Sequence, residues 1–282
     1  MIASYFYGKH LYAKTEMIYN VEMMRKNDGP IGFYDSGVGG VSVLRETARL
    51  LPGEDFIYYG DNAHAPYGVK DEEEIKKLSL ACGDFLYNAG AKMIVIACNT
   101  ATSIVVKTMR ENYNLPVISM EPAVKPACEK HKQGKIAVLA TPATLRQKRY
   151  HALVERLGIG ERVIDVHCSG LAELVELGRL DNPQIKACIC EKLAPLRGED
   201  VRALVIGCTH YSFISEQIGK VAGKLFKNKP ELFDGLYGTA RQVAAVLKEE
   251  SLESGKNGRG SISFHSSDGE DAADLLNKFY TL

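Results

Sequence analysis

The stretch "KMIVIACNTATSIVVKTMRENY", Lys92 to Tyr113, joins a strand to a helix through a polar turn. Its first half is a continuous aliphatic run, typical of a parallel strand that is covered on both faces. Its second half carries apolar residues at helical spacing. Cys98 lies at the junction, where the strand stops and the turn begins. Its side chain is either a small buried hydrophobe or a reactive thiol.

The same unit recurs along the chain, because short apolar runs alternate with amphipathic segments from Ile31 onward. This alternation predicts an α/β fold with parallel sheets and helices on both faces. We expect two pseudo-symmetric, doubly wound domains with the active site in the cleft between them. Their expected ranges are 31–121 with 232–282 for the first and 122–231 for the second, after an extension, 1–30, with no assigned role.

The composition excludes several classes of partner. Lys plus Arg equals Asp plus Glu, at 35 each in 282 residues, so no global field attracts nucleic acid or an anionic membrane. No apolar run approaches the roughly 20 residues that span a bilayer, and the first segment lacks the pattern of a signal peptide. Seven scattered cysteines favour free thiols in a reducing compartment. We expect a cytoplasmic protein.

Polar turns follow several of the expected strands, and ligands of such sheets bind beyond the carboxyl ends of the strands. The turns are "DSGVGG", "PYG", "ACNT", "ATPAT" and "GCTH". One of them belongs to "LVIGCTHYS", Leu204 to Ser212, which repeats the pattern around Cys98 and places Cys208 at the matching position. If the two strands belong to facing domains, the two thiols lie on opposite sides of one cleft.

The position of each cysteine suits a thiolate, whose free pKa of about 8.5 falls near a helix N-terminus or a cation. Cys98 and Cys208 both precede expected helices, where the amide dipoles favour an anion. His210, two residues beyond Cys208, is placed to exchange a proton with that thiol or with a substrate amine.

The turn "DSGVGG" predicts a site for an amino acid. The amides of Gly37, Gly39 and Gly40 are suited to hold an anion, and Asp35 suits an ammonium group. The segment "GVGGVS" does not fit the dinucleotide motif GxGxxG, and the chain has no GK[ST] of a P-loop.

Two competing chemistries have little support. Cys188 and Cys190 point apart on an expected helix and no CxxC pair is present, so no metal site is expected. A Ser-His-Asp hydrolase is disfavoured because the GxSxG elbow is absent.

With "DSGVGG", "PYG", "ACNTA" and "GCTHY" in this order, the chain from Ile31 to about Leu282 resembles the glutamate racemases of the aspartate/glutamate racemase family. The resemblance implies interconversion of L- and D-glutamate without a cofactor, D-glutamate for peptidoglycan synthesis, and a homodimer. It implies no PLP, whereas the residues alone leave a Schiff-base lysine open. An aspartate racemase, or a non-catalytic amino-acid-binding protein of this fold, is the alternative.

The resemblance also implies residue roles. Cys98 would deprotonate D-glutamate and Cys208 would deprotonate L-glutamate, with Asp35, His210 and Glu176 assisting. The implied substrate-binding residues are Asp35, Ser36, Pro66, Tyr67, Gly68, Asn99, Thr100, Thr141, Thr144, Thr209 and His210. The chain departs from the family pattern at Gln147, where serine is common, and at Ser212, where proline is usual.

Overall fold

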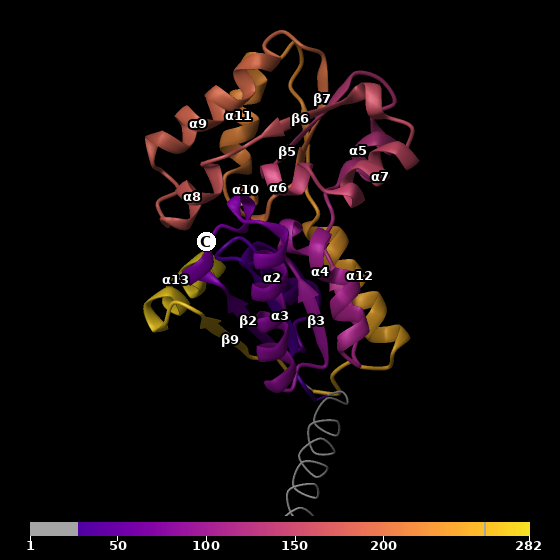
Figure 1. The fold of residues 1–282 in the computed structure, drawn as a ribbon, viewed down its shortest axis with the longest axis vertical. Coiled ribbons are helices and arrows are strands. Elements are labelled where there is room, and N and C mark those ends of the chain that lie inside the picture. The colour runs from indigo at the N-terminus through magenta and orange to yellow at the C-terminus, as the bar shows by residue number, and fades with distance from the viewer. Residues whose placement is uncertain (1–27, 257) are drawn as a thin grey trace, which may run out of the picture.

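The computed structural model describes residues 28–256 and 258–282. The expected extension, 1–30, lies outside the described residues except for its last three. The described chain forms two parallel sheets, each with helices on both faces, which lie one above the other along the long axis of the molecule (Figure 1). The predicted fold class is therefore confirmed.

The first sheet has five parallel strands in the order β4-β3-β1-β2-β9. In chain order the strands are β1 (Ile31–Asp35), β2 (Phe56–Gly60), β3 (Met93–Ile96), β4 (Val117–Ser119) and β9 (Ile262–Ser266). Because β1 pairs with β2 on one side and β3 on the other, the winding reverses at β1. Such a switch point is where a doubly wound sheet binds its ligand.

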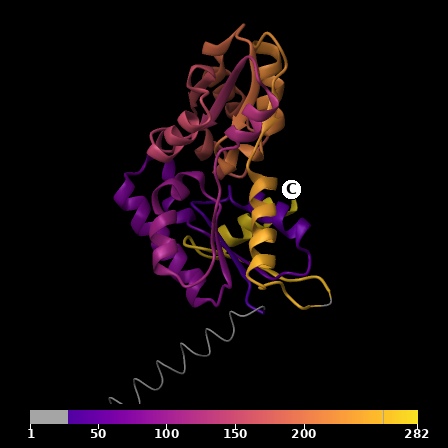
Figure 2. The ribbon, with the colours of Figure 1, turned by 90° about the vertical axis from the view of Figure 1, so that its right-hand side faces the viewer.

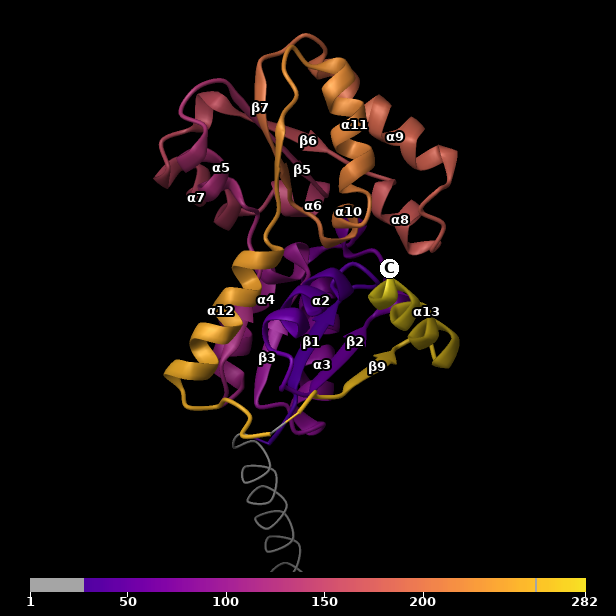
Figure 3. The ribbon, with the colours of Figure 1, turned by 180° about the vertical axis from the view of Figure 1, so that it is seen from behind.

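Both faces of this sheet are covered, which explains its continuous apolar strands. Phe33 of β1 packs into one core cluster and Tyr34 into another, since successive side chains point to opposite faces. The helices on the Phe33 face are α2 (Val41–Leu50), α12 (Leu236–Glu249) and α13 (Glu270–Thr281). Those on the Tyr34 face are α3 (Glu72–Asn88) and α4 (Asn99–Asn112). Figure 3 shows α12 and α13 from the rear.

The second sheet has four parallel strands in the order β6-β5-β7-β8. They are β5 (Lys135–Ala140), β6 (Val163–His167), β7 (Val201–Ile206) and β8 (Glu231–Phe233). Its helices are α5 (Val124–Lys130) and α7 (Lys148–Arg156) on one face, and α8 (Leu171–Glu176), α9 (Pro183–Leu193) and α11 (Ser215–Leu225) on the other. The chain passes between the sheets after β4 and again after β8 (Figure 2).

The expected boundary between 231 and 232 falls inside β8. That strand pairs with β7 from Ala203 with Glu231 to Val205 with Phe233, so the second sheet extends to residue 233. One core cluster also runs through both halves, since it contains Val41 of α2 and Val175 of α8. The exact division into domains stays a prediction.

The segment "LRQKRYHALVERLG", residues 145–158, does not form one continuous helix. A short helix, α6 (Pro142–Leu145), ends before Gln147, whose backbone is extended, and α7 begins at Lys148. The Gln147 amide donates to Glu72 at the start of α3, over 3.1 Å. Gln147 therefore contacts the other half of the molecule instead of continuing the helix.

A buried ion pair lies at the end of the first sheet away from the second. Lys92 Nζ donates to Glu54 Oε2 over 2.6 Å, and both side chains are nearly inaccessible. Lys92→Ala would leave the Glu54 carboxylate buried without this cation, so we expect a loss of about 3–5 kcal/mol in the free energy of unfolding. Urea denaturation measures it. The exposed Lys107, paired with Glu111, is the control: Lys107→Ala should change stability little, and equal losses would contradict the prediction.

Candidate active site

The carboxyl ends of the two sheets face each other across a small cavity. About 10 Å³ is left for the centres of water molecules, which is room for about one water. The residues that line it are Ser36, Pro66, Tyr67, Gly68, Cys98, Asn99, Thr100, Thr141, Ala172, Cys208, Thr209 and His210. Both candidate thiols thus border one space.

Three predicted site residues lie behind the lining rather than in it. The Asp35 carboxylate accepts from Ser36 and Thr209, both of which line the cavity. Thr144 forms a triangle with the lining residues Thr100 and Thr141, with each pair of hydroxyl oxygens 3.0 Å apart. Glu176 lies behind the lining residue His210, with its Oε1 against His210 Nε2.

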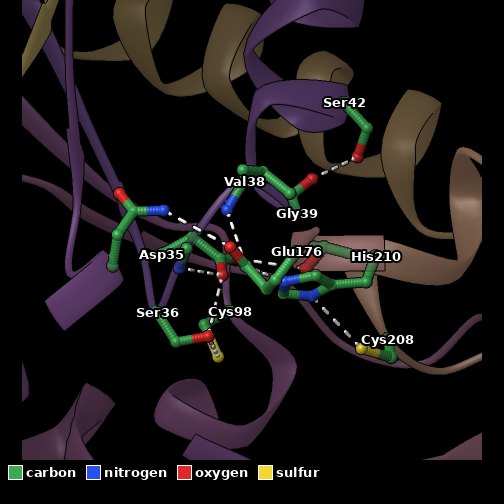
Figure 4. Close-up of polar contacts among 12 residues, drawn as sticks. Asp35, Ser36, Val38, Gly39, Ser42, Cys98, Glu176, Cys208 and His210 are labelled. Atoms are coloured by element: carbon green, nitrogen blue, oxygen red, sulfur yellow. Dashed lines mark hydrogen bonds and ion pairs between the residues drawn. The ribbon is translucent and has the colours of Figure 1, made fainter. Parts of the chain in front are cut away.

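Cys98 is the N-cap residue of α4, and its sulfur accepts from the Ala101 amide over 3.5 Å. Its thiol donates to Ser36 Oγ over 3.8 Å, and the Ser36 hydroxyl donates to Asp35 Oδ1 over 3.1 Å. Figure 4 shows these three side chains together. A proton leaving Cys98 therefore has a path to a carboxylate.

The ionisation of Cys98 differs from the sequence-based expectation. Burial raises the pKa of its thiol well above the usual range, and the Asp35 charge adds to this rise. The Ala101 amide lowers it, but by less. The helix N-terminus is therefore outweighed by desolvation, and in the closed site Cys98 carries a proton that it can donate.

Cys208 has a different neighbour, a histidine that is itself paired with a carboxylate. His210 Nδ1 lies 3.6 Å from the Cys208 sulfur, and His210 Nε2 is in close contact with Glu176 (Figure 4). Burial opposes a charged imidazole, but the Glu176 carboxylate and the Cys208 sulfur outweigh it and raise the pKa of His210 well above its usual value. His210 is therefore placed to exchange a proton with the Cys208 sulfur.

The glycine-rich turn binds carboxylates of the protein itself. The Gly37 amide donates to Asp35 Oδ1 over 3.2 Å, and the Val38 amide donates to Glu176 Oε1 over 2.9 Å. These two amides hold side chains of the protein, and the binding of a substrate anion by Gly37, Gly39 and Gly40 stays a prediction. A Cβ on Gly39 would lie 2.3 Å from Thr209 Oγ1, so glycine lets the second half approach.

Asn99 presents unused polar groups at the cavity. Its side chain is buried, and neither Oδ1 nor Nδ2 has a hydrogen-bond partner within the described residues. Because unsatisfied buried amides are costly, these atoms point to a polar ligand. The hydroxyl of Tyr67, another lining residue, already has a partner within the protein, since it donates to Asp61 Oδ2 over 2.5 Å.

The described residues contain neither a candidate metal site nor a candidate membrane span. No group of three or more His, Cys, Asp or Glu in 28–256 and 258–282 is placed to hold a metal ion. No helix over the same ranges is long and apolar enough to cross a membrane.

The sequence and the fold are similar to those of known proteins. The family model for Asp/Glu/hydantoin racemases matches residues 36–241. The chain belongs to the Asp/Glu racemase family. Within it, the glutamate racemase of Clostridium botulinum (strain Langeland) is 43% identical over 260 residues, which are 92% of this chain and 100% of that protein. The glutamate racemase of Clostridium perfringens (strain ATCC 13124) is 42% identical, over 85% of this chain and 91% of that protein.

Solved racemases of the family have the same fold. A glutamate racemase isoform of Bacillus anthracis superposes with a TM-score of 0.80 at 28% identity, covering 90% of this chain and 94% of its own. The Francisella tularensis glutamate racemase, solved with D-glutamate, gives 0.77 at 27% identity, covering 91% and 95%. The Escherichia coli enzyme, solved with L-glutamate and an activator, gives 0.75 at 27%, covering 89% and 95%.

Two residues of this racemase site were missed from the sequence. Ala172 lines the cavity, and Asn62 Nδ2 donates to Glu176 Oε2 over 3.4 Å. The signal for Asn62 was its place after the strand that ends at Gly60, just before "PYG". Nothing in the sequence indicated Ala172, because a small apolar residue in a helix is expected to pack in the core.

Proposed function

We propose that the chain is a cofactor-independent glutamate racemase in which one thiolate removes the α-proton and the opposite thiol returns a proton, and that it supplies D-glutamate for peptidoglycan. The observation that carries this proposal is that Cys98 and Cys208 line one cavity, each with its own proton path. Support also comes from the named glutamate racemases at 43% identity and from the solved enzymes that bind D- or L-glutamate.

The protonated Cys98 thiol and the roles implied by the family resemblance set the first step for L-glutamate. The Cys208 thiolate takes the α-proton, and the electron pair stays on Cα and spreads into the α-carboxylate. The Cys98 thiol then gives its proton to the opposite face of Cα. The product is D-glutamate, with Cys98 as thiolate and Cys208 as thiol. The reverse reaction runs through the same states, with one group acidic while the other is basic.

The carbanion-like state needs support, because an α-proton beside a carboxylate is very weakly acidic. The buried Asn99 amide and the hydroxyls of Thr100 and Thr141 are donors already fixed at the cavity wall. We assign them to the substrate carboxylates, since preorganised donors in a site closed to water stabilise developing charge most strongly. Asp35, beside Ser36 and Thr209, is suited to the ammonium group.

Glutamate enters only if the two halves separate, since the cavity has room for about one water. The contacts that close it across the halves include Thr209 Oγ1 with Asp35 Oδ2, over 3.0 Å, and the Val38 amide with Glu176. Substrate binding therefore includes an opening step.

The proposal is tested by incubating the purified protein in deuterated water, without PLP, with L-glutamate and separately with L-aspartate. We expect deuterium at the α-carbon of glutamate together with loss of optical rotation. Exchange with aspartate alone would identify an aspartate racemase instead. Absence of exchange with both amino acids would leave a binding protein of this fold.

Two expectations from the family resemblance belong to this proposal. We expect a homodimer, and its mass can be measured by light scattering. We also expect the protein to be located in the cytoplasm. Its seven cysteines are all free, which is typical of a reducing compartment.

A further inference from the structure

The carboxylate of Glu176 has no strongly preferred orientation of its own, because the last side-chain torsion of a glutamate is broad. Its orientation is therefore set by its hydrogen-bond partners. Its Oε1 accepts from the Val38 amide and contacts His210 Nε2. Its Oε2 accepts from Asn62 Nδ2 over 3.4 Å. Both oxygens are thus engaged, and both Val38 and Asn62 lie outside the cavity lining.

Asn62 is itself oriented by the C-terminal part of the chain. The Ser266 hydroxyl, at the end of β9, donates to Asn62 Oδ1 over 2.9 Å and accepts from the Asp268 amide over 3.1 Å. Because Oδ1 is occupied by a donor, the amide nitrogen of Asn62 faces Glu176.

The backbone around Asn62 is held as well. The Ser267 amide donates to the Gly60 carbonyl over 3.0 Å, and the Ala63 amide donates to Ser267 Oγ over 3.1 Å. A Cβ on Gly60 would lie 2.5 Å from Asn62 Oδ1, so glycine leaves the space that the Asn62 side chain fills. The loop that carries Asn62 is therefore anchored to the segment after β9.

We propose that Asn62 is a positioning residue for the Cys208 half of the active site, where it holds Glu176 against His210. The inference rests on the two-thiol function proposed above. Cys98 has a different chain of contacts, through Ser36 to Asp35, in which Asn62 takes no part. We therefore expect Asn62 to influence the proton transfer at Cys208 much more than the transfer at Cys98.

Asn62→Ala is expected to lower kcat/KM for racemisation by roughly ten-fold to one hundred-fold, the range for a lost hydrogen bond to a charged group. Its signature is the α-deuterium isotope effect on kcat/KM. In the variant the proton transfer at Cys208 becomes rate-limiting. Cys208 breaks the Cα–D bond of α-deuterated L-glutamate, so the isotope effect rises for that substrate. Cys98 breaks the bond of α-deuterated D-glutamate, so the isotope effect falls toward one there. Ser36→Ala, on the Cys98 side, should give the opposite pattern.

The matched control is Asn228→Ala, since Asn228 donates to Asp200 over 2.8 Å away from the site. It should keep the wild-type isotope effects. Should Asn62→Ala fold poorly by thermal denaturation, Ser266→Ala removes the hydrogen bond that orients Asn62 and is expected to shift the effects in the same direction. Isotope effects that stay unchanged, or change equally for both enantiomers, overturn the proposal.

A measurement without substrate separates this inference from the proposed function. The groups that face His210 are Glu176, Cys208 and Asp35. In Asn62→Ala the Glu176 carboxylate is held less firmly, so NMR of ¹⁵N-labelled histidine should give a lower pKa for His210 than in the wild type. An unchanged pKa rejects the role of Asn62. Failure of the wild type to racemise glutamate would instead reject the proposed function.

Discussion

Cys98→Ala and Cys208→Ala are each expected to lower kcat/KM for glutamate racemisation by about 10³-fold or more. A positioned acid or base contributes on the order of 10²–10⁴ to a rate, and each variant lacks one of the two groups that exchange the α-proton. Because both transfers occur in either direction, both variants should fail with both enantiomers. Circular dichroism of the glutamate measures the rate from each enantiomer.

The control for this pair is Cys190→Ala, because Cys190 is an exposed free cysteine of α9 away from the cavity. It should racemise glutamate at the wild-type rate. Full activity in either single cavity variant would contradict the two-thiol mechanism.

Gly37→Ala is expected to lower kcat/KM by about 10²-fold. A Cβ at this position would lie 1.8 Å from Glu176 Oε1, so one of the two must move. The carboxylate is the end of a flexible side chain and can swing away at small cost. It would then leave the Val38 amide and His210, and the Cys208 half would lose its charged partner.

Two measurements make this test specific. Thermal denaturation should show that Gly37→Ala is folded at the assay temperature, whereas the racemisation rate falls. Gly238→Ala, in α12, is the matched control, because a Cβ there meets no atom within 4 Å. It should keep activity and, as Ala replaces Gly inside a helix, be slightly more stable. Wild-type activity in Gly37→Ala would show that Glu176 is not required.

The alternation of strands and helices was predictable because it depends on local periodicity. A strand such as Met93–Ile96 is buried on both faces and reads as an aliphatic run, and an amphipathic helix such as Glu72–Asn88 begins and ends with capping residues. Its N-cap Asp71 accepts from the Glu74 amide, and Gly90 follows its end with φ of +82°. The interruption at Gln147 was not predictable, since its partner Glu72 lies 75 residues away in the chain.

The cavity was partly predictable for a similar reason. Parallel strands end at the same edge of a sheet, so the turns that follow them meet, and Cys98 and Cys208 accordingly line one cavity. The charge state of Cys98 was not predictable in this way. Its turn indicates a helix N-terminus that favours the thiolate, but the extent of burial, which only the packed structure defines, raises its pKa.

The sequence by itself determined the order of the elements, the parallel sheets and the positions of the two cysteines at strand ends, because these follow from side-chain periodicity and from the geometry of parallel strands. Only the tertiary structure decided which groups surround those cysteines. Glu176 meets the amide of Val38, 138 residues away, and Asn62, 114 residues away. Such contacts depend on how the two halves close on each other, and no local pattern encodes the distance between side chains that packing brings together.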